Sequence, residues 1–92
     1  MPRGNDMTKT TMHMRQEEFK NQRLLSENLK ALRGLCGLSQ LALADALGVT
    51  RQTVLMLENG KRPLTKTMFL ALLFVFSQYP RGKQALMQLG IL

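Results

Sequence analysis

The chain has 92 residues, of which 45% are hydrophobic, and this length suits one small domain and excludes two. Thirteen Lys and Arg residues against six Asp and Glu residues give a formal net charge of +7, which favours a polyanionic partner because binding phosphates releases condensed counterions. A single cysteine, Cys36, and a single histidine, His13, exclude a disulfide within the chain and a metal site built from these two residue types.

The N-terminal part divides into a tail and an extension. Residues 1–11, MPRGNDMTKTT, are polar and aperiodic, which predicts a disordered tail. Helix formers begin at Met12, so residues 12–24 are predicted as an N-terminal helical extension. Ser26 can either cap a new helix or lie inside one long helix, and both readings fit the sequence. No apolar run is followed by a small-residue cleavage site, so we expect a cytoplasmic protein.

Three short helices are predicted next, within a domain that we assign to residues 25–79. The first carries its apolar face on Leu29, Leu32 and Leu35 and ends near Gly37. The second starts at an N-cap, Ser39, and ends at Gly48, where a left-handed backbone would penalise a Cβ. The third is capped by Thr50 and runs to about Asn59, after which Gly60 and Pro63 predict a turn.

Two apolar helices are predicted at the C-terminal end. Thr65 is expected to cap a fourth helix over about residues 66–78, and Pro80 starts a fifth that forms the C-terminal segment 80–92. The run MFLALLFVF is too short for a membrane span, which needs about 20 residues, so it predicts a buried helix. Because this run is apolar on every side, either a second subunit or the terminal helices are expected to cover it. We expect a two-fold dimer through this end of the chain, in which some of these residues serve only as core. The residues chosen for the dimer contact are Phe74, Phe76, Leu86, Leu89 and Ile91.

No stretch alternates apolar and polar residues, so the fold is predicted to be all-α with five helices.

The second and third predicted helices carry a helix-turn-helix pattern. Two helices that cross through a short turn need an inner apolar face, a small residue at their contact and a glycine at the corner. The window from Gln40 to Asn59 supplies these at Leu43, Leu47, Val49, Val54 and Leu57, at Ala44, and at Gly48.

The stretch LSQLALADALGVTRQTVLMLENGKRP resembles the helix-turn-helix domain of the phage repressor and Cro type, which includes the Xre family of bacterial regulators. The matching features are Leu38-Ser39-Gln40, Ala44, Gly48-Val49, Glu58-Asn59-Gly60-Lys61 and the upstream LKALR. The resemblance covers roughly Leu25 to Phe76. It implies a lambda-repressor-like five-helix fold that binds double-stranded DNA.

The resemblance also implies residue roles. Residues 51–59 become the recognition helix in the major groove, and Arg33 pairs with Glu58 as a structural salt bridge. Arg suits the guanine edge and Gln the adenine edge, while amides at helix N-termini favour phosphate. At the position of Gln40 the family uses a glutamine to bind a phosphate or to brace the third helix. The predicted DNA-binding residues are Gln40, Thr50, Arg51, Gln52, Thr53, Met56, Asn59, Lys61 and Arg62.

Two apolar residues of the third helix, Leu55 and Met56, are predicted to point outward, because helical geometry turns Val54 and Leu57 inward. The family usually has polar residues at both positions. Contact with thymine methyl groups, contact with a protein, and ordinary surface exposure are all consistent with this arrangement.

These features predict a sequence-specific, DNA-binding transcriptional regulator of the repressor type that acts as a homodimer. No clustered carboxylates or activated nucleophile are present, so we expect no enzymatic activity, no cofactor, no metal and no membrane association. The alternatives are an antitoxin-type autoregulator with a toxin or other regulator as protein partner, and a protein-binding module that uses Leu55 and Met56. A further hypothesis gives partner binding to the N-terminal helical segment, which would fold when the partner arrives.

Overall fold

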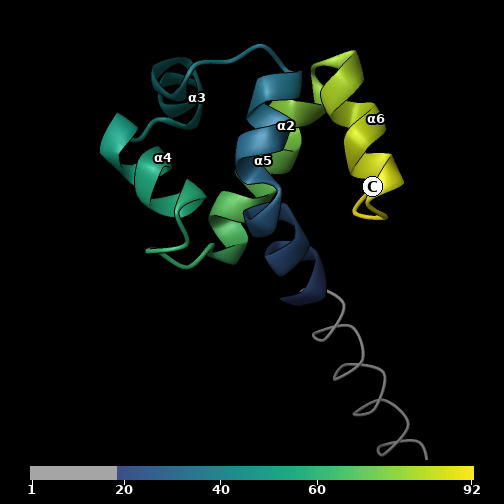
Figure 1. Ribbon diagram of the computed structural model, residues 1–92, viewed down its shortest axis with the longest axis horizontal. Helices are drawn as coiled ribbons and strands as arrows, with labels where there is room; N and C mark the ends of the chain where they lie inside the picture. Colours follow the sequence, from purple (N-terminus) through teal and green to yellow (C-terminus); the bar gives the residue numbers. More distant parts are fainter. Residues whose placement is uncertain (1–18) are drawn as a thin grey trace, which may run out of the picture.

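The computed structural model describes residues 19–92, and its regular elements are all helical (Figure 1). A helical segment at residues 19–27 precedes α2 (Leu29–Leu35), α3 (Gln40–Leu47), α4 (Arg51–Glu58), α5 (Lys66–Ser77) and α6 (Pro80–Gln88). The predicted all-α fold is confirmed. The predicted tail at residues 1–11 and the first part of the predicted extension, residues 12–18, lie outside the described residues.

A one-residue turn at Asn28 separates the helical segment 19–27 from α2. The Asn28 Nδ2 donates to the Leu24 carbonyl oxygen at 2.8 Å, so the side chain competes with the backbone for a helical acceptor. The Leu32 N–H in turn donates to the Asn28 carbonyl oxygen at 2.9 Å, and α2 follows without a loop. The break therefore falls at Asn28, and Ser26 is not the cap of α2.

Hydroxyl side chains begin three of the helices, as the sequence predicts. Each oxygen accepts a hydrogen bond from the backbone N–H three residues later: Ser39 from Ala42 at 3.0 Å, Thr50 from Thr53 at 3.2 Å, and Thr65 from Met68 at 3.2 Å. Such caps are each worth about 1 kcal/mol of stability. Because capping is a local interaction, these helix starts are readable from the sequence alone.

One hydrophobic core joins all the helices of the described chain. Its fully buried side chains include Leu25 from the helical segment 19–27, Leu43 from α3 and Leu86 from α6. Figure 1 shows α3 and α4 at one end of the bundle, α2 and α5 in the middle, and α6 at the other end. Since α6 packs against both α2 and α5, the C-terminal segment is part of the same domain.

The predicted dimer residues fall into three groups in the structure. Phe76 and Leu86 are fully buried in the core of a single chain, so their place in a subunit contact is excluded. Leu89 and Ile91 are partly buried against the same core. Phe74, in contrast, is 69% exposed. The apolar run on α5 is therefore explained mostly by burial within the chain, with Leu70 and Phe74 as the exceptions.

Gly82 sets the close approach of α6 to the rest of the bundle. A Cβ at this position would lie 2.5 Å from the Phe76 carbonyl oxygen and 2.6 Å from the Cys36 Sγ. Both distances are shorter than van der Waals contact, so a residue larger than glycine would push α6 outward. Cys36 is thus a packing residue, and its partial burial raises the pKa of the thiol above the ordinary value.

Candidate nucleic-acid interface

The corner between α3 and α4 is built around Gly48. Its φ of 72° lies in the left-handed region, which a residue with a Cβ rarely adopts. The Val49 N–H donates to the Ala44 carbonyl oxygen at 3.0 Å, which satisfies an acceptor at the end of α3. Ala44 itself is fully buried, and α3 and α4 pack closely. These features give a rigid helix-turn-helix.

The helix α4 buries an apolar side and exposes the polar residues of its first turn. Val54 and Leu57 are buried in the core, whereas Arg51 and Gln52 at its first turn are exposed. Thr53 is partly buried, and its hydroxyl lies 3.0 Å from the Thr50 hydroxyl. The exposed first turn leaves an arginine and a glutamine available to a ligand.

A chain of four polar side chains runs from α2 to the first turn of α4. The Arg33 Nε donates to the Glu58 Oε2 at 2.6 Å, and its Nη2 donates to Oε1 at 3.3 Å. The Gln40 Nε2 donates to the same Glu58 Oε1 at 3.1 Å. The Gln40 Oε1 then accepts a hydrogen bond from the Arg51 Nε at 3.3 Å. The orientation of Arg51 is therefore linked, through Gln40, to a partly buried ion pair.

The ion pair is well shielded, since the Glu58 side chain is only 2% exposed. Burial alone would raise the pKa of Glu58. The hydrogen bonds from Arg33 and Gln40, with the charges of Arg33 and Lys30, outweigh burial and hold this pKa below its ordinary value. Glu58 is thus the charged partner of Arg33 at neutral pH. A third bond, from the Arg33 Nη1 to the Leu38 carbonyl oxygen at 2.9 Å, anchors the guanidinium further.

The loop that follows α4 carries basic residues. The Lys61 N–H donates to the Met56 carbonyl oxygen at 2.9 Å and closes the end of α4. Asn59, Lys61 and Arg62 are exposed. The Leu64 carbonyl oxygen accepts a hydrogen bond from the Gln22 Nε2 at 3.0 Å. Sequence reasoning missed Gln22, because 42 residues separate these partners and no local pattern marks the contact.

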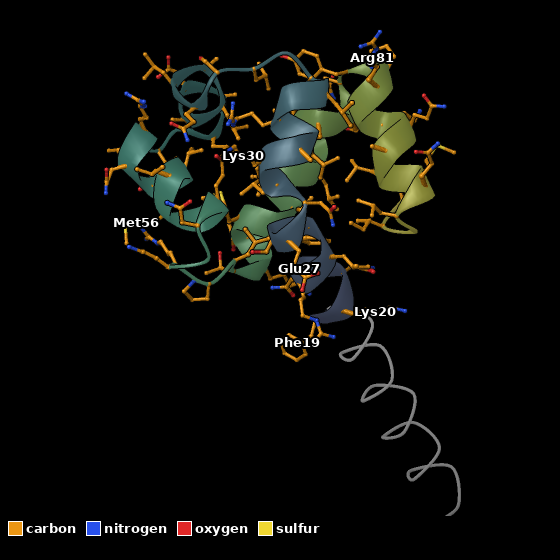
Figure 2. All side chains as sticks on the ribbon, in the orientation of Figure 1. Phe19, Lys20, Glu27, Lys30, Met56 and Arg81 are labelled. Atoms are coloured by element: carbon orange, nitrogen blue, oxygen red, sulfur yellow. The ribbon has the colours of Figure 1, made fainter. Side chains whose placement is uncertain are left out.

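Leu55 and Met56, the two residues of α4 that are predicted to point outward, differ in exposure. Leu55 is exposed, as the helical geometry predicts, whereas Met56 is partly buried. Figure 2 shows Met56 at the outer edge of α4, on the side away from α6. The neighbouring helix α3 adds a second exposed leucine, Leu41. The helix-turn-helix surface therefore combines cationic, amide and apolar groups.

Residues 19–92 contain no cluster of His, Cys, Asp or Glu side chains that could hold a metal ion. In the same range, no helix has the length and apolar character needed to cross a membrane.

A family model described as helix-turn-helix matches residues 29–74, which is half of the chain. The chain therefore belongs to the helix-turn-helix family of the phage repressor and Cro type. This is a family of DNA-binding regulators and not of enzymes, so the protein is a DNA-binding transcription regulator. Searches of curated proteins and of solved structures gave no match. The helical segment 19–27 and α6 lie outside the matched residues.

Proposed function

We propose that this protein is a sequence-specific repressor that binds operator DNA as a homodimer through α4. The observation that carries the proposal is the first turn of α4, where Arg51 and Gln52 are exposed and Arg51 is held by Gln40. A preorganised arginine loses less side-chain freedom when it meets a base. Arg51 would donate two hydrogen bonds to a guanine edge, and Gln52 would pair with an adenine edge.

Phosphate contacts would fix the register of α4 on the duplex. The N-termini of α3 and α4 present backbone N–H groups and the positive ends of their helix dipoles. The remaining predicted contacts are the side chains of Gln40, Thr50, Thr53, Asn59, Lys61 and Arg62, with Met56 against a thymine methyl group. Because Glu58 is neutralised by Arg33, the acid closest to this surface in sequence does not repel the backbone.

The proposed dimer uses the exposed face of α5. Phe74 is 69% exposed and Leu70, four residues earlier, is 53% exposed. The other exposed positions between residues 67 and 78 are Thr67 and Gln78, so this face carries no charge. Two chains of net charge +7 repel each other, and an uncharged apolar face minimises that repulsion. A dimer with two recognition helices would read half-sites about one DNA turn apart.

A second candidate function uses the same domain to bind a protein, as an antitoxin-type regulator would bind its toxin. It is favoured by the exposed Leu41 on α3 and Leu55 on α4, and by the partly buried Met56, which follows Leu55 on α4. An apolar contact of this kind resists salt, whereas phosphate contacts weaken steeply as salt rises. Salt dependence therefore separates the two candidates.

The test is the affinity for a labelled random-sequence duplex of about 30 base pairs, roughly three DNA turns, at rising salt. We expect wild-type binding to fall with salt, and the double variant Arg51→Ala with Gln52→Ala to bind more weakly. The matched control is Arg81→Ala with Gln84→Ala, which removes the same two residue types from exposed positions of α6. Arg81 lies at the end of the molecule away from α4 (Figure 2).

Equal losses in the two double variants would mean that only net charge matters and would contradict a role for the first turn of α4. Absence of DNA binding by the wild type would contradict the proposal as a whole. In that case, Met56→Asp and Leu55→Asp become the variants to test against a protein partner.

A further inference from the structure

The helical segment 19–27 lies against the loop that joins α4 to α5. Its Gln22 Nε2 donates to the Leu64 carbonyl oxygen at 3.0 Å, and both residues are partly buried. The segment and the loop also line a shared groove of about 380 Å³, whose walls include Phe19 and Arg23 on one side and Pro63 on the other. Figure 2 shows Phe19 and Glu27 on this segment, at the end of the molecule away from Arg81.

The loop carries exposed basic side chains but has no regular structure of its own. Lys61 and Arg62 are exposed, and the backbone between Lys61 and Thr65 is outside any helix. Its two ends are fixed by the bond from the Lys61 N–H to α4 and by the Thr65 cap of α5. The hydrogen bond from Gln22 adds a tie near the C-terminal end of the loop, directly before that cap.

We propose that Gln22 is a positioning residue for DNA binding, which holds the 61–64 loop so that Lys61 and Arg62 meet the phosphate backbone. The DNA-binding unit would then begin before Leu29, where the family match starts. This inference rests on the proposed function. A loop that is ordered before binding does not lose that conformational freedom at the moment of binding, so its contacts contribute more affinity.

The anchoring of the helical segment does not depend on Gln22. Leu25, on the same segment, is fully buried in the core, and the Asn28 turn connects the segment directly to α2. A variant that lacks only the Gln22 donor therefore keeps the segment in place. Only the hydrogen bond from Gln22 to the loop is lost in this variant. Its effect on DNA binding therefore distinguishes a positioning role of Gln22 from a role in folding.

The test compares Gln22→Met, which keeps a similar side-chain length but has no donor, with Gln84→Met on the exposed face of α6. Both variants are titrated with the same random-sequence duplex at several salt concentrations. We expect Gln22→Met to bind roughly three- to ten-fold more weakly, as loop ordering moves to the binding step. The salt slope should be shallower, because Lys61 and Arg62 no longer reach the phosphates together. Gln84→Met should bind like the wild type.

A double-variant comparison shows whether Gln22 acts through the loop. In a background with Lys61→Ala and Arg62→Ala, the proposal predicts that Gln22→Met has no further effect on affinity. Amide hydrogen exchange of the free protein gives a second readout that needs no DNA. Gln22→Met should speed exchange at the Lys61 amide, whose hydrogen bond to the Met56 carbonyl oxygen fixes the start of the loop, and leave the amides of the buried α5 positions unchanged.

The outcomes separate this inference from the proposed function. If the loop variant loses affinity while Gln22→Met binds and exchanges like the wild type, the inference is overturned and the proposed function stands. An equal loss from Gln22→Met in both backgrounds also overturns it, because Gln22 then acts elsewhere. A wild-type protein that does not bind duplex DNA overturns both.

Discussion

The Arg33 Nε lies 2.6 Å from the Glu58 Oε2, and this ion pair ties α2 to the end of α4. The same carboxylate also accepts from Gln40, whose other amide atom holds Arg51. A partly buried structural interaction is thereby connected to a side chain on the surface that we propose reads DNA. The Glu58 carboxylate consequently contributes both to the stability of the domain and, through Gln40, to the orientation of Arg51.

Removal of Arg33 should destabilise the fold strongly. Arg33→Met leaves the Glu58 carboxylate 2% exposed without its cation, and breaking a shielded ion pair in this way costs about 3 kcal/mol. The free energy of unfolding, from denaturant titration followed by circular dichroism, measures the loss. The double variant Arg33→Met with Glu58→Met should recover much of it, because no charge is then left unpaired. A single variant as stable as the wild type would contradict this description of the pair.

Stability should also fall in acid, and Glu58 should account for part of the fall. Its folded pKa lies below the ordinary value, so the folded state binds fewer protons than the unfolded state near the unfolded pKa of about 4.3. The contribution of Glu58 is therefore complete above that pH and is lost as pH falls through the folded pKa. Unfolding of the wild type and of Glu58→Gln, compared from neutral pH downward, should converge in acid. A difference that does not change with pH would refute the linkage.

Two glycines within helices should respond in opposite directions to the same substitution. Gly82→Ala forces a Cβ against the Phe76 carbonyl oxygen and the Cys36 Sγ, and we expect a loss of about 1–3 kcal/mol from this overpacking. Gly34→Ala in α2 meets no atom within 4 Å, so it should gain up to about 1 kcal/mol from the higher helix propensity of alanine. The thermal unfolding temperatures of the two variants, each compared with that of the wild type, test these opposite changes in stability. Equal changes would show that α6 does not approach α2 and α5 as closely as described.

A charge on α5 should disrupt the proposed dimer. Phe74→Glu places a carboxylate on both sides of the two-fold contact, where like charges repel and the apolar contact is lost. Light scattering after size-exclusion chromatography should report a monomer for this variant and a dimer for the wild type. The control is Phe19→Glu, since Phe19 is similarly exposed at 67% but lies on the helical segment 19–27. Dimerisation that survives in Phe74→Glu would move the contact away from this face.

The parts of the fold that the sequence predicts are those held by local chemistry. Ser39, Thr50 and Thr65 cap helices with the amide three residues later, and Gly48 adopts the left-handed conformation expected at the corner. The period of the apolar residues likewise assigns Val54 and Leu57 to the core. Each of these features depends on residues within one or two helical turns, so a single sequence contains the necessary information.

The parts that the sequence does not predict depend on distant contacts. Gln22 reaches Leu64 across 42 residues, and the close approach at Gly82 depends on Phe76 of α5 and on Cys36, which follows the end of α2. The sequence also does not show what covers Phe76 and Leu86, because an apolar residue gives the same sequence pattern whether a helix of its own chain or a second subunit buries it. The resemblance implies that Gln40 can brace the third helix, but its bond to Arg51 in particular depends on how α3 and α4 cross.

Selection of bound sites from a pool of random duplexes tests the central proposal most directly, when it is done at about 150 mM salt, where specific binding exceeds the electrostatic background. Wild-type protein and the Gln52→Ala variant are selected in parallel. We predict an inverted repeat from the wild type, with half-sites about one DNA turn apart, and a loss of preference at one position of each half-site from the variant. Recovery of no motif, or of the same motif by both proteins, would contradict base reading by the first turn of α4.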